Sequence, residues 1–433
     1  MEKLLTAPVL GGKIKAISSK SMAHRLLICA AFAQSGCEIV CEDTNDDILA
    51  TVGCLEALGA KIERIGSSFF VTPISGVCRG EALDCGESGS TLRFMLPITA
   101  AIGAESTFYM RGRLPYRPLS PLYELLEQNG IYLTPQGTNP LITSGKLLGK
   151  DFSISANISS QFISGLMFAI PLLQRFDGKN EEEDTPSSLA LIGNIESSPY
   201  IDMTLDALRE FGVAVEEAYP NADRGETKKY LFPPECAFTS PLRLEVEGDW
   251  SNAAFWLAAG AIGKEPIKVT SLNTRSHQGD MEMIKLLRNF GADVIVSGDE
   301  VTVFPARLHG TRINAAQIPD LVPILAVVAA LSEGETTIFG ASRLRLKESD
   351  RLLSVSAMLS ALGANIKETS DGLVINGVPR LKGGRVDSAG DHRIAMAAAI
   401  ASIACENGVL ISGAEATQKS YPKFWEDFER LSK

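Results

Sequence analysis

Apolar residues recur at helical spacing along much of the chain, and five of these amphipathic stretches end in the same way. Each is followed by a glycine and then a short run of β-favouring residues, and the glycines lie about 70 to 80 residues apart. A glycine at this place is typical of a left-handed C-terminal helix cap. We therefore expect helices that end near the following residues: Gly59, Gly130, Gly212, Gly291 and Gly363.

A second set of helical stretches alternates with the first and is apolar on nearly every face, as in residues 253–262 and 394–404. A helix without a polar face lies in the interior of a domain. These inner helices should begin near Ser19, Ser88, Ser159, Asp249, Asp320 and Asp391. The first set, which includes residues 122–130, 280–291 and a last helix near 422–431, carries charges and should lie outside.

Short β-favouring runs, such as residues 68–72, 294–296 and 301–303, separate the helices. The pattern predicts six α/β units, each with an inner helix, an outer helix and several strands. A hydrophobic core rarely grows beyond about 250–300 residues, so the units divide into two domains of three. An open solenoid of repeats is the alternative. The extra length of the third unit should form two polar loops, residues 177–188 and 218–234.

The net charge of −11 argues against a general nucleic-acid or membrane surface, so an anionic ligand would need a local basic cluster. The chain has no apolar run of the roughly 18 residues that span a bilayer, and its N-terminus is too short in apolar residues for a signal peptide. We expect a cytoplasmic protein. The eight cysteines include no C-x-x-C pair and the four histidines no ligand spacing, which predicts reduced thiols and no protein-bound metal.

Basic residues follow the predicted starts of three inner helices: Lys20 with Arg25, Arg93, and Arg393. Each polar residue before a helix is, on its own, most simply an N-cap. A cation at the positive end of a helix costs energy, however, unless an anion lies there too. Helix N-termini that combine exposed N–H groups with Lys or Arg favour a phosphate or carboxylate ligand. No P-loop accompanies Ser19-Lys20-Ser21, so a nucleotide is not expected.

Further basic residues gather in residues 111–117, in residues 343–351 and at Lys419. The run 343–351 could equally be a solvated surface segment. Two acids, Asp320 and Glu348, stand beside these cations. An acid is unfavourable in a site for anions, so its presence indicates proton transfer rather than binding.

Taken together, these segments resemble the 3-phosphoshikimate 1-carboxyvinyltransferase (5-enolpyruvylshikimate-3-phosphate synthase) family of enolpyruvyl transferases. The similar segments follow in the family's order along the whole chain: 19–21 with Arg25, 86–93, Arg117-Pro118, 159–162, 197–202, 247–249, 278–280, 318–320, 347–351, 391–393 and 419–422. Any one of them is a weak signal, but the whole series is specific.

The resemblance implies an α/β fold of two inside-out barrel domains, each of three repeated βαβαββ-type units, joined by a double crossover. One domain would comprise residues 1–17 and 240–433, and residues 18–239 would form the other. It also implies a monomer that transfers the enolpyruvyl group of phosphoenolpyruvate to the 5-hydroxyl of shikimate 3-phosphate, without a metal or other cofactor.

Roles follow from the resemblance position by position. Asp320 would be the base, Glu348 the proton donor, and Lys20 a further catalytic residue. Shikimate 3-phosphate would be held by Lys20, Ser21, Arg25, Ser159, Ser160, Gln161, Ser197, Asp320 and Lys347. Phosphoenolpyruvate would be held by Lys20, Gly89, Arg117, Gln161, Arg351, Arg393 and Lys419.

Four positions depart from the commoner family pattern. Ile17-Ser18 replaces Pro-Gly, and Glu87 and Arg343 each replace an Asn. The alternative enzyme is the UDP-N-acetylglucosamine enolpyruvyl transferase, whose mobile loop carries a reactive Cys that residues 111–117 lack. An inactive repeat protein that binds anionic metabolites is the alternative from another class.

Overall fold

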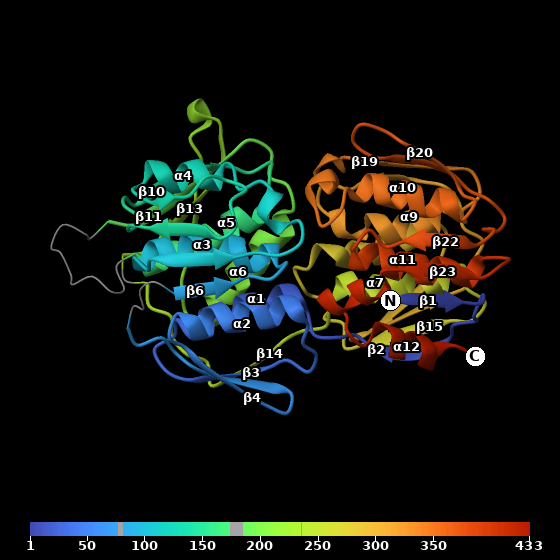
Figure 1. Cartoon of the computed structure of the whole chain (residues 1–433), viewed down its shortest axis with the longest axis horizontal. Coiled ribbons are helices and arrows are strands. Elements are labelled where there is room, and N and C mark those ends of the chain that lie inside the picture. The colour runs from blue at the N-terminus through green and yellow to red at the C-terminus, as the bar shows by residue number, and fades with distance from the viewer. Residues whose placement is uncertain (77–80, 174–184, 235) are drawn as a thin grey trace. The chain divides into compact units, whose positions relative to one another are not determined.

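The structure, a computed structural model, describes residues 1–76, 81–173, 185–234 and 236–433. The chain forms two compact units, each with its own hydrophobic core. Unit 1 comprises residues 1–19 and 247–433, and unit 2 comprises residues 20–246 (Figure 1). Cys78 and residues 177–184 of the first predicted loop lie outside the described residues.

Unit 2 contains three small sheets, counted over its described residues, and their strand orders are β14-β3-β5-β4, β6-β7-β9-β8 and β10-β11-β13-β12. Its strands are β3 (Cys37–Val40), β4 (Lys61–Ile65), β5 (Ser68–Thr72), β6 (Glu81–Asp84), β7 (Ser106–Tyr109), β8 (Tyr132–Leu133), β9 (Leu141–Ser144), β10 (Asp151–Ser155), β11 (Ser187–Ile192), β12 (Glu216–Ala218), β13 (Glu226–Phe232) and β14 (Arg243–Glu245). Its helices are α1 (Lys20–Ala31), α2 (Asp46–Ala57), α3 (Gly89–Ile102), α4 (Leu122–Gln128), α5 (Ser160–Ala169) and α6 (Ser198–Glu210), with short 3₁₀ helices η1 (Leu114–Tyr116), η2 (Ile170–Leu172) and η3 (Ala222–Arg224).

Unit 1 repeats the plan with the sheets β16-β17-β15-β2, β18-β19-β21-β20 and β1-β23-β22. Its strands are β1 (Glu2–Leu5), β2 (Gly12–Lys15), β15 (Ile267–Thr270), β16 (Asp293–Ser297), β17 (Glu300–Phe304), β18 (Arg312–Asn314), β19 (Glu335–Phe339), β20 (Asn365–Glu368), β21 (Leu373–Asn376), β22 (Gly384–Asp387) and β23 (Val409–Ser412). Its helices are α7 (Trp250–Ile262), α8 (Met283–Asn289), α9 (Val322–Ala330), α10 (Arg351–Ala361), α11 (His392–Ala401) and α12 (Phe424–Leu431), with η4 (Gly279–Glu282), η5 (Pro319–Leu321), η6 (Ser342–Leu346), η7 (Ser402–Ala404) and η8 (Ala414–Lys419).

The predicted inner helices lie inside their units. In unit 1, α7, α9 and α11 pack against one another, and every residue of α9 is buried (Figure 1). In unit 2, α3 packs along α5, and the first residue of each helix, Gly89 or Ser160, is buried. The helices face the core from all sides because they carry no polar face.

The predicted glycine caps are confirmed. All five glycines have positive φ, from 73° at Gly212 to 103° at Gly59, a conformation that L side chains rarely adopt. The three predicted β runs are confirmed as β5, β16 and β17, and the last predicted helix as α12.

The structure differs from two expectations, one about a loop and one about a domain boundary. Residues 218–234 are not a polar loop: β13 pairs antiparallel with both β11 and β12. The run of charged residues hid the strand, in which Tyr230 and Phe232 alternate inward and are buried. Residues 240–246 fall in unit 2 because β14 pairs in parallel with β3.

Within the described part of the chain, no helix combines the length and the apolar character that crossing a membrane would need. Six of the described cysteines are buried, as expected for structural thiols, and only Cys236 is partly exposed.

The contact of α3 with α5 gives a stability prediction. A Cβ added at Gly165 would lie 2.4 Å from Arg93 O and 2.9 Å from Pro97 Cγ, so the helices would have to separate. We expect Gly165→Ala to destabilise unit 2 by about 1–3 kcal/mol in urea unfolding, the usual cost of overpacking. Gly53→Ala is the matched control, because a Cβ on this exposed face of α2 meets nothing within 4 Å. It should stabilise the helix by about 0.5–1 kcal/mol. Equal effects of the two changes would contradict this packing.

Candidate active site

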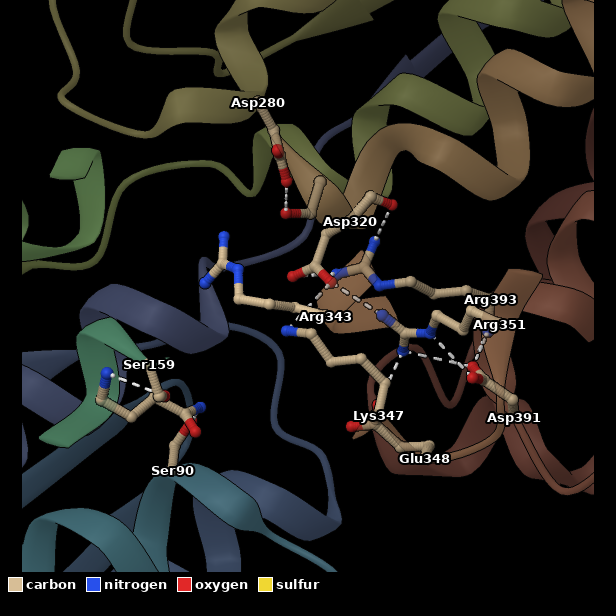
Figure 2. Close-up of polar contacts among 12 residues, drawn as sticks. Ser90, Ser159, Asp280, Asp320, Arg343, Lys347, Glu348, Arg351, Asp391 and Arg393 are labelled. Atoms are coloured by element: carbon tan, nitrogen blue, oxygen red, sulfur yellow. Dashed lines mark hydrogen bonds and ion pairs between the residues drawn. The ribbon is translucent and has the colours of Figure 1, made fainter. Parts of the chain in front are cut away.

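A buried arginine joins three carboxylates at the start of α10. Arg351 is the first residue of the helix, and only 1% of its side chain is exposed. Nε lies 2.8 Å from Asp391 Oδ2, Nη1 lies 2.7 Å from Asp320 Oδ1, and Nη2 lies 2.9 Å from Glu348 Oε2 (Figure 2). Burial lowers the pKa of Arg351, but the three carboxylates outweigh burial and raise it above its ordinary value. The guanidinium is therefore a fixed cation that orients all three acids.

Asp320 is the carboxylate on which the cations of unit 1 converge. It lies in η5, and neither η5 nor the following α9 has a side-chain cap at its start. Besides Arg351, its carboxylate lies 3.3 Å from Arg393 Nη2 and 3.9 Å from Lys347 Nζ. The corresponding residue before α11, Asp391, does cap its helix, since it accepts a hydrogen bond from Arg393 N at 3.0 Å. The equivalent position before α9 instead presents its acid to cations.

These cations set the protonation of Asp320. Burial alone would raise its pKa, yet Arg393, Lys347 and Arg351 hold the pKa of Asp320 well below its usual range. Burial also lowers the pKa of Lys347 to about 8, although Asp320 opposes the shift. Near neutral pH, Asp320 is therefore ionised and able to accept a proton, and Lys347 carries its charge less firmly than an exposed lysine.

Glu348 completes the cluster. Its Oε1 lies 3.7 Å from Lys419 Nζ, and the two side chains are only 13% and 10% exposed. The structure thus connects six residues that the sequence singled out: Asp320, Lys347, Glu348, Arg351, Arg393 and Lys419. Because the run 343–351 supplies three of them, it is not a solvated surface segment.

Unit 2 holds its own cluster of predicted residues. Lys20, the first residue of α1, places Nζ 2.8 Å from Asp47 Oδ2, and the Asp47 side chain is 6% exposed. A lysine at the positive end of a helix is unfavourable, whereas an aspartate in the first turn of α2 is favourable. The ion pair with Asp47 offsets the unfavourable placement of Lys20 and fixes its ammonium group at the start of α1.

Two arginines approach the start of α3. A Cβ added at Gly89 would lie 2.5 Å from Arg93 Nη1 and 2.8 Å from Arg117 Nη1, so the glycine leaves the space that the guanidinium groups use. Arg93 donates to Gln161 Oε1 at 3.0 Å, and Gln161 Nε2 donates to Ser90 Oγ at 2.8 Å. The starts of α3 and α5 are thereby linked through the side chain of Gln161.

Three predicted serines lie at the starts of α5 and α6. Ser159 caps α5 by accepting a hydrogen bond from Gln161 N at 3.3 Å, and Ser160 is the first residue of that helix. Ser197, directly before α6, is buried and has a φ of 55°. A left-handed conformation is uncommon outside glycine and concentrates at functional sites, where the surroundings enforce it.

Arg25 is buried, and its guanidinium hydrogen-bonds to groups of the fold itself. Its guanidinium donates to the main-chain oxygens of Ser21 at 2.6 Å and Tyr200 at 2.8 Å, and Nε donates to Thr204 Oγ1 at 3.0 Å. Burial lowers its pKa to about 10. Arg25 therefore ties α1 to α6 and holds Ser21 in place.

Asp47 and Asp391 are not among the site residues predicted from the sequence, and Arg93 is predicted as a cation at a helix start but is not assigned to either substrate. A cation at a helix start needs a counter-ion, which is the signal that could have prompted a search for the two aspartates. Glu87 and Arg343, the two residues that replace an Asn of the family pattern, each contact the main chain or a glycine nearby. Glu87 lies against Gly112, where a Cβ would be 2.4 Å from Oε1, and Arg343 Nη2 donates to Ala316 O at 2.8 Å.

No group of three or more His, Cys, Asp and Glu side chains is arranged to hold a metal ion, as far as the described residues extend. The arrangement that the structure does show, buried carboxylates held by fixed cations, can bind anions and move protons.

Comparison with known proteins covers the chain almost completely. The family model for EPSP synthase (3-phosphoshikimate 1-carboxyvinyltransferase) matches residues 6–428. A curated relative, the 3-phosphoshikimate 1-carboxyvinyltransferase of Clostridium perfringens (strain SM101), is 41% identical over 100% of this chain and 99% of its own length.

Two solved structures share the fold. The EPSP synthase of Acinetobacter baumannii has a TM-score of 0.76 at 24% identity and covers 100% of this chain and 98% of its own. The enolpyruvyl transferase NikO of Streptomyces tendae has a TM-score of 0.75 at 18% identity and covers 99% and 97%. Since both enzymes match equally well, these two likenesses establish an α/β fold and do not separate one enolpyruvyl transferase from another. The match to the family model and the 41% identity do make that distinction: the chain belongs to the EPSP synthase (3-phosphoshikimate 1-carboxyvinyltransferase) family.

Proposed function

We propose that the chain transfers the enolpyruvyl group of phosphoenolpyruvate to the 5-hydroxyl of shikimate 3-phosphate and releases phosphate. The observation that carries the proposal is Asp320, an acid whose side chain is only 17% exposed and which Arg351, Arg393 and Lys347 keep ionised. The two substrates bring two phosphates and a carboxylate, so their binding requires several fixed cations. Proton transfer requires an acid among those cations, and Asp320 supplies it.

Each substrate has its own proposed set of residues, and Lys20 and Gln161 belong to both sets. In the proposal, shikimate 3-phosphate is held by Lys20, Ser21, Arg25, Ser159, Ser160, Gln161, Ser197, Asp320 and Lys347. Phosphoenolpyruvate is held by Lys20, Gly89, Arg117, Gln161, Arg351, Arg393 and Lys419. Arginine forks suit a planar carboxylate and a phosphate because they donate two parallel hydrogen bonds.

The chemistry is an addition followed by an elimination. Asp320 accepts the proton of the 5-hydroxyl while the hydroxyl oxygen bonds to C2 of phosphoenolpyruvate, and Glu348, in its protonated form, gives its proton to C3. The tetrahedral adduct then loses phosphate from C2, while the Glu348 carboxylate takes a proton back from C3. The ligand anions offset the cations around Asp320, which raises its proton affinity when the substrates are bound. Asp320 is therefore a stronger base in the complex with both substrates than in the protein without them.

We also propose that units 1 and 2 are the two domains, each an inside-out α/β barrel of three repeats, joined by a double crossover. In support, each unit contributes three open sheets among its described residues, and its most apolar helices are buried. We propose that the enzyme acts as a cytoplasmic monomer.

Release of phosphate tests the proposed function. Purified protein should release phosphate only when both shikimate 3-phosphate and phosphoenolpyruvate are present. The matched control replaces shikimate 3-phosphate with UDP-N-acetylglucosamine and should yield none. Activity with the UDP-sugar instead, or with neither acceptor, would overturn the proposal.

The base can be tested by an isosteric change. Asp320→Asn removes the proton acceptor without changing the volume of the side chain, so kcat should fall by roughly 10²–10⁴-fold. The affinity for shikimate 3-phosphate, measured by calorimetry, should change little. Asp293→Asn, at an exposed position of β16, is the control. Normal turnover of Asp320→Asn would show that another group takes the proton.

A second change tests the cations near α3. Because a Cβ at Gly89 would displace both Arg93 Nη1 and Arg117 Nη1, Gly89→Ala should weaken phosphoenolpyruvate binding. Loss of one charge-assisted hydrogen bond, about 1.5–3 kcal/mol, corresponds to a KM roughly 10- to 100-fold higher. The KM for shikimate 3-phosphate and the melting temperature should stay near those of the control Gly53→Ala. An unchanged KM for phosphoenolpyruvate would remove Gly89 and Arg117 from its proposed site.

A further inference from the structure

One further buried acid of unit 1, Asp280, lies outside the roles described so far. Asp280 is part of η4, and only 2% of the residue is exposed. Its Oδ2 accepts a hydrogen bond from Ser251 Oγ, while Oδ1 is buried without a hydrogen-bond partner among the described residues (Asp280 is labelled in Figure 2). An ionised carboxylate can accept about four hydrogen bonds, so a single donor leaves it poorly satisfied.

The charged groups that face Asp280 come from three elements. η4 packs on α7, and α7 packs in turn on η5 and α11. Asp320 on η5 repels the ionised form of Asp280, and so does Asp249 at the start of α7. Asp249 caps α7 by accepting a hydrogen bond from Asn252 N at 2.7 Å, so its negative charge stabilises the start of that helix. The attractive charge is Arg393 on α11.

Arg393 is already engaged by a different acid. Its Nη2 lies 3.3 Å from Asp320 Oδ2, and its Nη1 donates to Asp320 O at 3.2 Å. Asp280 and Asp320 are both attracted by Arg393 and repel each other, so they do not both ionise readily, because each charge raises the cost of the other. Asp320 has Arg351 and Lys347 in addition, so Asp280 is the acid that keeps its proton. In agreement, burial, with Asp320 adding to it, raises the pKa of Asp280 to about 7, although Arg393 and Ser251 oppose the shift.

We propose that Asp280 is a positioning residue: its burial with a single hydrogen-bond donor keeps it neutral, and it thereby leaves the charge of Arg393 to Asp320 and to the anionic substrate. The proposal rests on the proposed function for the role given to Arg393. When Asp280 loses its proton, a second negative charge competes for Arg393. The affinity for phosphoenolpyruvate therefore falls as the pH rises through this ionisation.

The kinetic test compares Asp280→Asn with the native protein, since an amide has the shape of a protonated carboxyl and cannot ionise. The KM for phosphoenolpyruvate is measured from about pH 5.5 to about pH 8.5. The ratio of the native KM to the variant KM should rise by roughly tenfold across pH 7, the effect of about 1.4 kcal/mol. Because the ionisation of phosphoenolpyruvate affects both KM values equally, it cancels in the ratio of the native KM to the variant KM. A ratio that stays flat across this range overturns the proposal.

Ser251→Ala tests the same ionisation independently, because it changes the pKa of Asp280 without replacing Asp280 itself. Without the hydroxyl that stabilises the ionised carboxylate, the rise in KM should begin at a higher pH than in the native protein. The matched control, Asp293→Asn, should leave the midpoint of the rise in place. A midpoint that Ser251→Ala does not move would show that another group is titrating.

A measurement without substrate separates this proposal from the proposed function. Since folding raises the pKa of Asp280, the native state binds its proton more tightly than the unfolded state. The stability from this group is full below about pH 4 and is lost as the pH rises to about 7. The melting temperature of Asp280→Asn relative to the native protein should therefore increase between these two pH values. A constant difference overturns the protonation of Asp280, whereas absence of phosphate release by the native protein overturns the function alone.

Discussion

The ion contacts of Arg351 are the constraint on which the site in unit 1 depends. A buried guanidinium cannot stand alone, and its planar fork reaches three acids: Asp320 of η5, Glu348 between η6 and α10, and Asp391 directly before α11. Removing one partner of such a group leaves an unpaired buried charge, which costs several kcal/mol. The cluster therefore holds Asp320 and Glu348 in fixed places before any ligand arrives. Fixed charges are what makes electrostatic stabilisation effective, because none has to reorganise during the reaction.

The same physical problem recurs at several helix starts. Lys20, Arg351 and Arg393 all lie in the first turn of a helix, where the dipole disfavours a cation. The protein answers with a nearby aspartate: Asp47 for the first and Asp391 for the second. These carboxylates let the fold tolerate cations at positions suited to bind anions. The placement of charge is a compromise between folding and binding.

Local patterns predicted much of the fold. The inner helices, the glycine caps and the short strands depend on neighbours in sequence, and those predictions are confirmed. The pattern failed at β13, where Lys228 and Lys229 suggested a loop, since the pairing with β11 comes from far along the chain. The candidate site shows the same division. Motifs identified Asp320, Glu348 and the basic residues, whereas Asp47 and Asp280 matter through contacts that only the folded chain creates.

A conservative replacement of Arg351 tests the central claim most directly. Lysine keeps the charge, but its single ammonium group cannot span three carboxylates. The kcat/KM of Arg351→Lys should fall by roughly 10²-fold or more, the scale on which loss of one fixed charge contact affects a transition state. Arg345→Lys is the control, since Arg345 lies on the neighbouring η6, pairs with Glu368 of β20 at 2.7 Å and has a side chain that is 30% exposed. Native-like activity of Arg351→Lys would contradict the account, because the carboxylates would then be held by something else.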